Sequence, residues 1–479
     1  PCVPCSIVRF SSDVTHSLHF PEELTRHFCP RLLLPRGIYA KILFVMVSQS
    51  RSAKFRATAD NPKLPRRRNS DTTHRRVLYM LSLLLPVIYL AFISLGLPDS
   101  LLGSAWPEMY QLMGMPISAA GIVTMIISAC TIISSLLSDR INRRFGTGVV
   151  VTVSVAMTVA GMFGFSFAGT FPVLCAFAVP YGLGAGAIDA ALNNYVALHY
   201  SSRQMSWLHC FWGVGTIISP YIMSHAIASG KGWAMGYRIV GFIQVGVLAV
   251  LLLALPLWKK VSAESGSIQE SGGNTTTSPD GKSFGVAHAL KIPGVIFMLL
   301  GFLGSGVIES TIMLWASSFL FQTRGITEEK AAAFGSLYFI GITAGRFLSG
   351  FVSDRIGDRN MIRIGLSIVA VGIGVIALPF GGTLLPVFGF ILLGIGCAPV
   401  YPSIIHSTPF HFGKENSQSV IGIQMAFSYI GSSLMPPVFG LLADNVSIRL
   451  LPAFLLFFLI LSVVMLECLN RIDRAAGRY

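Results

Sequence analysis

Two short segments repeat one pattern of charges: Ser135-Leu-Leu-Ser-Asp139-Arg140-Ile-Asn-Arg143-Arg144 and Gly350-Phe-Val-Ser-Asp354-Arg355-Ile-Gly357-Asp-Arg359. Each places an Asp-Arg pair and further arginines directly after a long apolar run, and the two copies lie 215 residues apart. A charged cluster that recurs at the same place after an apolar run indicates an internal repeat. The chain is therefore predicted to consist of two related halves.

Further landmarks recur in the same order, at nearly the same offset. An acid followed by Ser, a Gly-x-Gly and a Gly with a nearby Pro in the first half each recur at the corresponding place in the second half, with offsets of 210, 212 and 216 residues. The pairs are Asp99 and Glu309, Gly182 and Gly394, and Gly215 and Gly431. Four ordered landmarks make chance similarity improbable.

The composition indicates that these halves cross a membrane. The 479 residues are 53% hydrophobic and 12% charged, whereas about one quarter of a soluble domain is charged. A bilayer core needs roughly 20 apolar residues per helix, which predicts an all-α integral membrane protein of twelve spans. They lie near 77–105, 117–137, 147–166, 171–198, 207–228, 237–257, 291–321, 331–350, 361–380, 384–406, 417–441 and 447–469.

The basic residues predict the topology. With the N-terminus inside, fifteen loop Lys and Arg fall on the cytoplasmic side and five on the other, so both termini are predicted to be cytoplasmic in a cell membrane. The predicted parts are a basic, disordered tail over 1–76, a six-helix half over 77–257, a cytoplasmic linker over 258–290, a six-helix half over 291–470 and a tail over 471–479.

The net charge of +14 does not indicate nucleic-acid binding, because fourteen of the 35 Lys and Arg lie in residues 1–76. Such a tail beside the first span favours contact with an anionic bilayer. The first methionine is Met46, and we expect the segment before it to be a fusion, a fragment or an upstream reading of the frame. Cys2 and Cys5 form a lone CxxC without further ligands, so no metal site is predicted.

The repeated loop, Gly-x-x-x-Asp-Arg-x-Gly-x-Arg in its second copy, resembles the signature loop of the major facilitator superfamily. The first copy has Ser135 and Asn142 at its glycine positions. The resemblance covers nearly all of 77–470 and implies that the loops hold the cytoplasmic side shut in one state. By this resemblance gating is assigned to Asp139, Arg140, Arg143, Arg144, Asp354, Arg355 and Arg359; the alternative for the arginines is a purely topological charge.

Four ionisable residues are the clear cases of charge inside predicted spans: Asp99, Asp189, Glu309 and Arg346. Each costs several kcal/mol in lipid unless it faces a cavity or a partner. Burial in a medium of low dielectric constant favours the neutral form of a carboxyl group, so such a group can load and release a proton. Asp99 and Asp189 are the predicted proton-coupling residues, with a structural hydrogen-bonded pair or direct contact with the substrate as the alternatives. Arg346 is expected to be a packing or gate partner rather than a ligand.

This layout is similar to the fucose permease branch of the superfamily, the sugar-proton symporters and their relatives. That branch carries an acid in the first span, as Asp99 stands here, and an acid followed by Asn in the fourth span, as with Asp189 and Asn193. Its fifth-span Gln and Asn positions are His209 and Trp212 here. The residues predicted to bind substrate are Asn193, Asn194, His209, Trp212, Glu309, Trp315 and Gln424. For His209 and Gln424 a bond to a neighbouring helix is an equal alternative, and aromatic residues in spans are more often packing residues.

The sequence contains no Walker loop, no HExxH helix and no nucleophile elbow. We therefore expect no enzyme, no cofactor and no ATP-driven pump, but a monomeric secondary transporter for a small solute and protons. Proton-coupled uptake of a sugar or similar polar solute is the leading hypothesis. An efflux antiporter is the rival, because Gly213-x-Gly215-x-x-x-Ser219-Pro220 partly resembles the fifth-span motif of drug-proton antiporters; a sensor or scaffold without transport is a third reading.

Overall fold

A computed structural model describes residues 68–116, 119–271, 286–325, 334, 337–379, 382 and 384–477 of the chain. Every regular element within these residues is a helix. Most of the predicted basic tail, the central part of the predicted linker, and Cys2 and Cys5 lie outside the described residues.

The helices before the predicted linker account for the first six predicted spans. Their bounds are α3 Arg68–Asp99, α4 Leu101–Leu112, α5 Ala120–Phe145, α6 Thr147–Phe167, α7 Phe171–His199, α8 Ser202–Ala228 and α9 Gly232–Ser271. Both α3 and α9 extend beyond the predicted apolar runs into polar sequence, because a helix can continue into water where a hydropathy count stops.

The helices after the linker account for the other six spans. Their bounds are α10 Val286–Ala289, α11 Val295–Arg324, α13 Leu337–Ile356, α14 Asp358–Ala377, α15 Leu384–Phe412, α16 Lys414–Asn445, the short 3₁₀-helix η2 Ile448–Leu450, and α17 Leu451–Ala475. The predicted helical class with twelve spans is therefore confirmed.

Two of the twelve helices are less apolar than the rest. In the described part of the chain, ten spans have the length and hydropathy to cross a membrane unaided. The remaining two long helices are α8 and α13, and α13 carries Arg346, which is 3% exposed. Such helices are tolerated in a membrane when their polar faces lie against the bundle interior. By contrast, Leu253 on α9 is 82% exposed, as expected of a side chain that faces lipid.

The first span is broken beside Asp99. Helix α3 ends at Asp99 and α4 begins at Leu101, with Ser100 between them. Pro98 lacks a backbone N–H and its ring disfavours the regular helix on its N-terminal side. The hydroxyl of Ser100 donates to the carbonyl oxygen of Thr216 in α8 at 2.7 Å. The break therefore places a carboxyl group next to irregular backbone inside the bundle.

The repeat is visible in how glycines pack. A Cβ on Gly182 of α7 would lie 2.5 Å from the carbonyl oxygen of Ile127 in α5. A Cβ on Gly394 of α15 would lie 2.5 Å from that of Tyr338 in α13. Only glycine allows two helix backbones to come this close. The fourth predicted span thus packs on the second, and the tenth packs on the eighth, in the same way.

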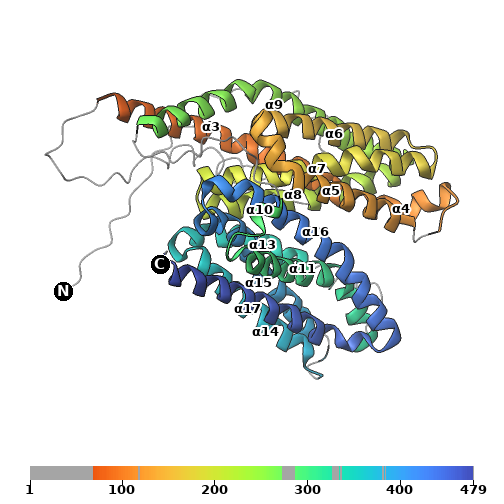
Figure 1. The fold of residues 1–479 in the computed structure, drawn as a ribbon. Coiled ribbons are helices and arrows are strands. Elements are labelled where there is room, and N and C mark those ends of the chain that lie inside the picture. The colour runs from red at the N-terminus through yellow and green to blue at the C-terminus, as the bar shows by residue number, and fades with distance from the viewer. Residues whose placement is uncertain are drawn as a thin grey trace, which may run out of the picture. The chain divides into compact units, whose positions relative to one another are not determined.

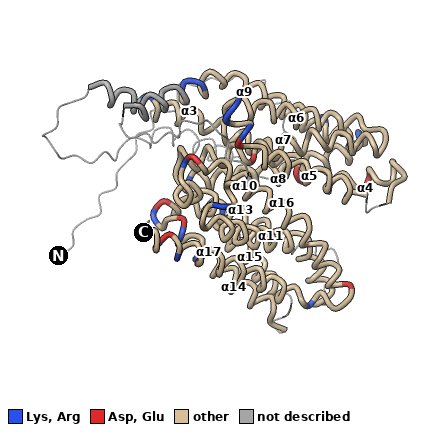
Figure 2. The backbone as a smooth tube through the Cα atoms, in the orientation of Figure 1, with Lys and Arg blue, Asp and Glu red and all other residues tan. Residues whose placement is uncertain are grey.

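Figure 1 shows helices α3 to α9 lying together and helices α11 to α17 lying together. The two groups meet where α5, α7 and α8 contact α13, α15 and α16. Figure 2 shows that charged residues are sparse along the helices and gather near their ends. The interface between the two groups is therefore the place to look for a polar site within the apolar helices.

Candidate functional site

A cavity of about 350 Å³ lies between the two groups of helices. Its lining comes from α3, α5, α7 and α8 on one side, and from α11, α13, α15 and α16 on the other. All four ionisable residues predicted inside spans line it, together with aromatic and hydroxyl side chains. The polar and aromatic lining residues are Phe92, Asp99, Ser128, Thr131, Tyr181, Asp189, His209, Trp212, Glu309, Ser310, Arg346, Tyr401, Ser428, Tyr429 and Ser432.

Asp99 is held by two donors from its own group of helices. The phenol of Tyr181 in α7 donates to Oδ1 at 2.8 Å, and the indole Nε1 of Trp212 in α8 donates to Oδ2 at 2.8 Å. Both oxygens therefore accept a hydrogen bond while the carboxyl group borders the cavity. This geometry suits the ionised form and fixes the orientation of the carboxylate.

Asp189 is held from both groups. Asn193, one turn along α7, donates from Nδ2 to Oδ1 at 2.7 Å, and the phenol of Tyr429 in α16 donates to Oδ2 at 3.0 Å. The amide oxygen of Asn193 accepts from Nε2 of His209 at 3.1 Å. Asp189 is thus the carboxyl group whose hydrogen bond joins the two halves of the cavity wall.

Glu309 and Arg346 form an ion pair on the opposite wall. Nη2 of Arg346 lies 3.0 Å from Oε1 of Glu309, and the side chains are 4% and 16% exposed. The guanidinium also lies over the ring of Trp212, 5.4 Å from its centroid. Because Trp212 donates to Asp99, one continuous chain of contacts runs from Asp99 to Glu309.

Four residues predicted to bind substrate, Asn193, Asn194, Trp315 and Gln424, lie outside this lining. The amide oxygen of Asn194 accepts from Ser417 at 2.7 Å, that of Gln424 accepts from Thr408 at 3.0 Å, and Trp315 donates to the carbonyl oxygen of Pro436 at 2.9 Å. Asn193 is fully buried behind Asp189. The structure therefore brings His209, Trp212 and Glu309 to the cavity, whereas Gln424 bonds a neighbouring helix.

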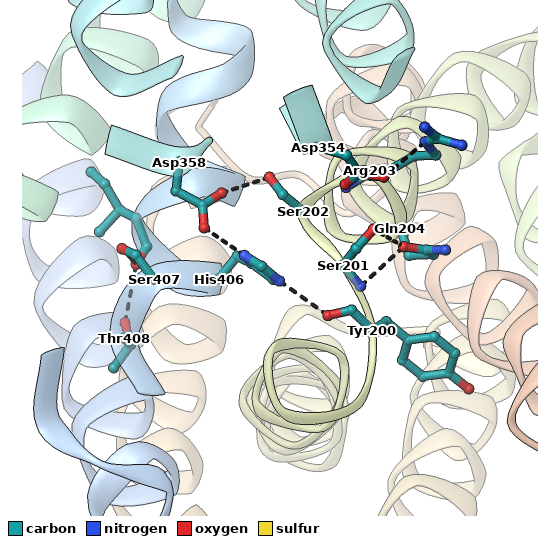
Figure 3. A network of polar contacts seen from close by, with 11 residues as sticks. Tyr200, Ser201, Ser202, Arg203, Gln204, Asp354, Asp358, His406, Ser407 and Thr408 are labelled. Atoms are coloured by element: carbon teal, nitrogen blue, oxygen red, sulfur yellow. Dashed lines mark hydrogen bonds and ion pairs between the residues drawn. The ribbon is translucent and has the colours of Figure 1, made fainter. Parts of the chain in front are cut away.

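The second Asp-Arg loop closes one end of the interface. Asp354 accepts from the backbone N–H of Arg203 at 3.0 Å, and its Oδ2 lies 3.1 Å from Nε of the same residue (Figure 3). Arg203 lies in the first turn of α8, where the helix dipole favours a negative charge. The acid of the loop thus binds a helix N-terminus of the other group. Arg355 is exposed.

The first loop reaches the other group less directly. Nε of Arg143 donates to Oδ1 of Asp139 at 2.8 Å, one helical turn away. Nη2 of Arg143 donates to the carbonyl oxygen of Glu415 in α16 at 2.8 Å. Arg140 and Arg144 are exposed, and Arg144 lies over the ring of Phe145. At the first loop Arg143 therefore supplies a hydrogen bond between the two groups.

Several residues of this site were not predicted from the sequence. Tyr181 and Tyr429 donate to the two cavity aspartates, and Arg203 and His406 belong to the closed end. A tyrosine inside an apolar run is a recognisable signal, because its hydroxyl needs a partner when buried. The pairing of Arg203 with a residue 151 positions away could not be read from either segment alone.

The sequence profile of the Major Facilitator Superfamily matches residues 88–335 and 298–476. The chain belongs to the major facilitator superfamily. Its members are transporters and not enzymes, and this chain is a multi-pass membrane transporter of the superfamily.

Curated relatives of this transporter are distant. It is 22% identical over 402 residues to "Bypass of stop codon protein 6" of Saccharomyces cerevisiae, covering 78% of this chain and 80% of that protein. It is 24% identical over 289 residues to the hexuronate transporter of Bacillus subtilis, covering 58% and 67%. The family is established by the profile match and not by these identities, and the substrate is left to be argued from the cavity.

Two solved structures share the fold. The proton:xylose symporter XylE bound to 6-bromo-6-deoxy-D-glucose gives a TM-score of 0.67 at 13% identity, covering 80% of this chain and 93% of that chain. The transporter FucP in its outward conformation gives 0.61 at 12% identity, covering 80% and 98%. At these identities the likeness establishes the arrangement of helices.

Proposed function

We propose that this transporter takes up a neutral polyhydroxylated solute, a sugar or a similar compound, together with protons by alternating access. The observation that carries the proposal is the pair of carboxyl groups in the central cavity, Asp99 and Asp189, each with both oxygens accepting hydrogen bonds. The likeness to the proton:xylose symporter supports the substrate class.

The charges of the lining favour a neutral solute over an anion. The cavity is lined by three carboxyl groups, Asp99, Asp189 and Glu309, and by one guanidinium, that of Arg346. Arg346 is already paired with Glu309 at 3.0 Å. An organophosphate or a hexuronate would meet the carboxyl groups of Asp99 and Asp189 and, among the described lining residues, no Lys or Arg other than the paired Arg346. The hydroxyl groups of a neutral solute can instead donate to the carboxylates, and the apolar face of its ring can stack against Trp212 and Tyr401.

Asp189 couples protonation to movement in this proposal. A hydrogen bond to an ionised acceptor is roughly twice as strong as a neutral one, and the bond from Tyr429 to Asp189 joins the two groups of helices. Proton uptake by Asp189 therefore weakens a contact that holds the groups together. Solute and proton together would then favour the state that is open on the other side.

We assign the end closed by Asp139 and Asp354 to the cytoplasm, so that the cavity opens to the outside of a cell membrane and both termini are cytoplasmic. The excess of basic loop residues at that end supports this orientation. We propose six-helix halves over 77–257 and 291–470 as the moving bodies, a monomer as the working unit, and Asp99, Asp189, His209, Trp212 and Glu309 as the residues that handle solute and proton.

Uptake by the purified full-length chain in proteoliposomes tests the function. Radiolabelled neutral sugars and a hexuronate are compared with and without an inward proton gradient. We expect the gradient to raise accumulation of at least one neutral sugar and not of the hexuronate. The exposed acid Asp444 supplies the matched control, Asp444→Asn, which keeps wild-type uptake. Wild-type uptake that ignores the gradient would contradict the coupling, and extrusion would favour the antiporter.

A further inference from the structure

His406 joins three elements at the closed end of the interface (Figure 3). Its Nδ1 lies 2.6 Å from Oδ2 of Asp358 at the start of α14, and its Nε2 lies 3.0 Å from the carbonyl oxygen of Tyr200, which follows α7. His406 itself belongs to α15, so its ring bridges the two groups of helices. The cavity carboxyl groups take no part in this contact.

Both ring nitrogens of His406 face acceptors. The carbonyl oxygen of Tyr200 can only accept, and Asp358 also accepts from the hydroxyl of Ser202 at 2.6 Å. A neutral imidazole carries one N–H and can satisfy one acceptor, whereas the imidazolium carries two. The geometry of the closed gate therefore fits the doubly protonated ring. The neutral ring would leave one acceptor without its donor.

The charged groups around His406 come from every neighbouring element. Asp358 contacts the ring, and Asp354 of α13 lies nearby, where Arg203 of α8 pairs with it. Asp358 stands in the first turn of α14, where the helix dipole supports its negative charge. The groove that His406 borders is also lined by Arg359, Arg363, His411, Lys414 and Glu467.

We propose that His406 is a protonation-dependent contact, called the latch below, that stabilises the closed state of the gate. As the imidazolium it ties α14 to the end of α7 and keeps this end closed; after losing a proton it can hold only one of the two. A protein state that binds an additional proton gains on the other state as the pH falls. The inference rests on the alternating-access proposal but not on its substrate or coupling ion. Acid on this side is thus expected to slow opening toward it.

Spin labels on Lys260→Cys in α9 and Asn360→Cys in α14 measure this opening, because both positions are exposed at the closed end. Native cysteines are replaced by alanine. The cavity carboxyl groups are neutralised by Asp99→Asn and Asp189→Asn, so that they cannot contribute a pH response. Between pH 8 and pH 5.5 we expect the closed-to-open ratio to rise by up to about tenfold per pH unit around the ordinary titration range of histidine.

His406→Gln and Asp358→Asn are expected to abolish this pH response, each by removing one ionised partner. His411→Gln is the matched control, because His411 stands on the same helix and pairs with Asp473 inside its own group. It should keep the wild-type response. A distance distribution that ignores pH with His406 present, or that responds equally in His406→Gln, would overturn the latch. Failure of solute uptake would not affect this measurement.

Discussion

The two Asp-Arg loops contact the other group of helices in two different ways. The second loop ends helix α13 at Gly357, whose φ is +79°, and α14 begins directly after it. The first loop has Asn142 at the equivalent position, and α5 continues to Phe145 before Gly146 takes up the same conformation, with a φ of +78°. With Asn142 at the position of Gly357, α5 thus ends one turn later in its loop than α13 ends in the second loop.

That extra turn changes the partner of each acid. In the first loop Arg143 stands one turn after Asp139 on the same helix and neutralises it. In the second loop the position one turn after Asp354 is occupied by Asp358, which cannot pair with another acid. Asp354 instead pairs with Arg203 of the other group. Asp358 in turn binds His406 and Ser202. We infer that the second loop carries more of the closing energy than the first.

Removing the two acids one at a time gives the largest expected effect. Asp354→Asn loses the ion pair with Arg203 and the charge at the N-terminus of α8, each worth about 0.3–1 kcal/mol. The open-to-closed ratio should therefore rise by about three- to thirtyfold, as measured with the spin labels on α9 and α14. Asp139→Asn leaves the bond from Arg143 to Glu415 in place, so a rise of less than about twofold is expected.

The exposed acid Asp444 again provides the control, since Asp444→Asn should leave the distances unchanged. Equal shifts for Asp354→Asn and Asp139→Asn would show that the two loops stabilise the closed state to the same extent.

Changing the length of α5 gives the smallest expected effect. Asn142→Gly introduces glycine into the last helical turn, which costs roughly 0.5–1 kcal/mol relative to alanine. The thermal midpoint of Asn142→Gly should therefore lie below that of Asn142→Ala by a few degrees or less. If the thermal midpoint of Asn142→Gly were instead higher than that of Asn142→Ala, the identity of residue 142 would not explain the extra turn of α5.

The fold could be predicted because its determinants are local and periodic. Apolar runs of sufficient length and the repeated glycines Gly182 and Gly394 specify which helices exist and which pack closely. Asp99, Asp189 and Glu309 were expected to face a common interior because carboxyl groups in lipid are costly, and the structure places them around one cavity.

The rest depends on rotation about each helix and on distant partners. Trp315 and Gln424 stand in spans that line the cavity, yet their side chains point to Pro436 and Thr408. An apolar helix with few charges gives little information about which side faces inward. His406 meets Tyr200 across 206 residues of sequence, and such a contact requires the packed helices to be known.

In the proposed mechanism solute and proton cross the membrane together, and Asp189 is the coupling residue. Adding the transported sugar to deenergised, weakly buffered proteoliposomes should make the external medium more alkaline as protons enter with it. Asp189→Asn should abolish this pH change and net accumulation while it keeps solute exchange. A sugar that enters the wild-type vesicles without any change of external pH, or an Asp189→Asn variant that still accumulates solute against a gradient, would contradict the account.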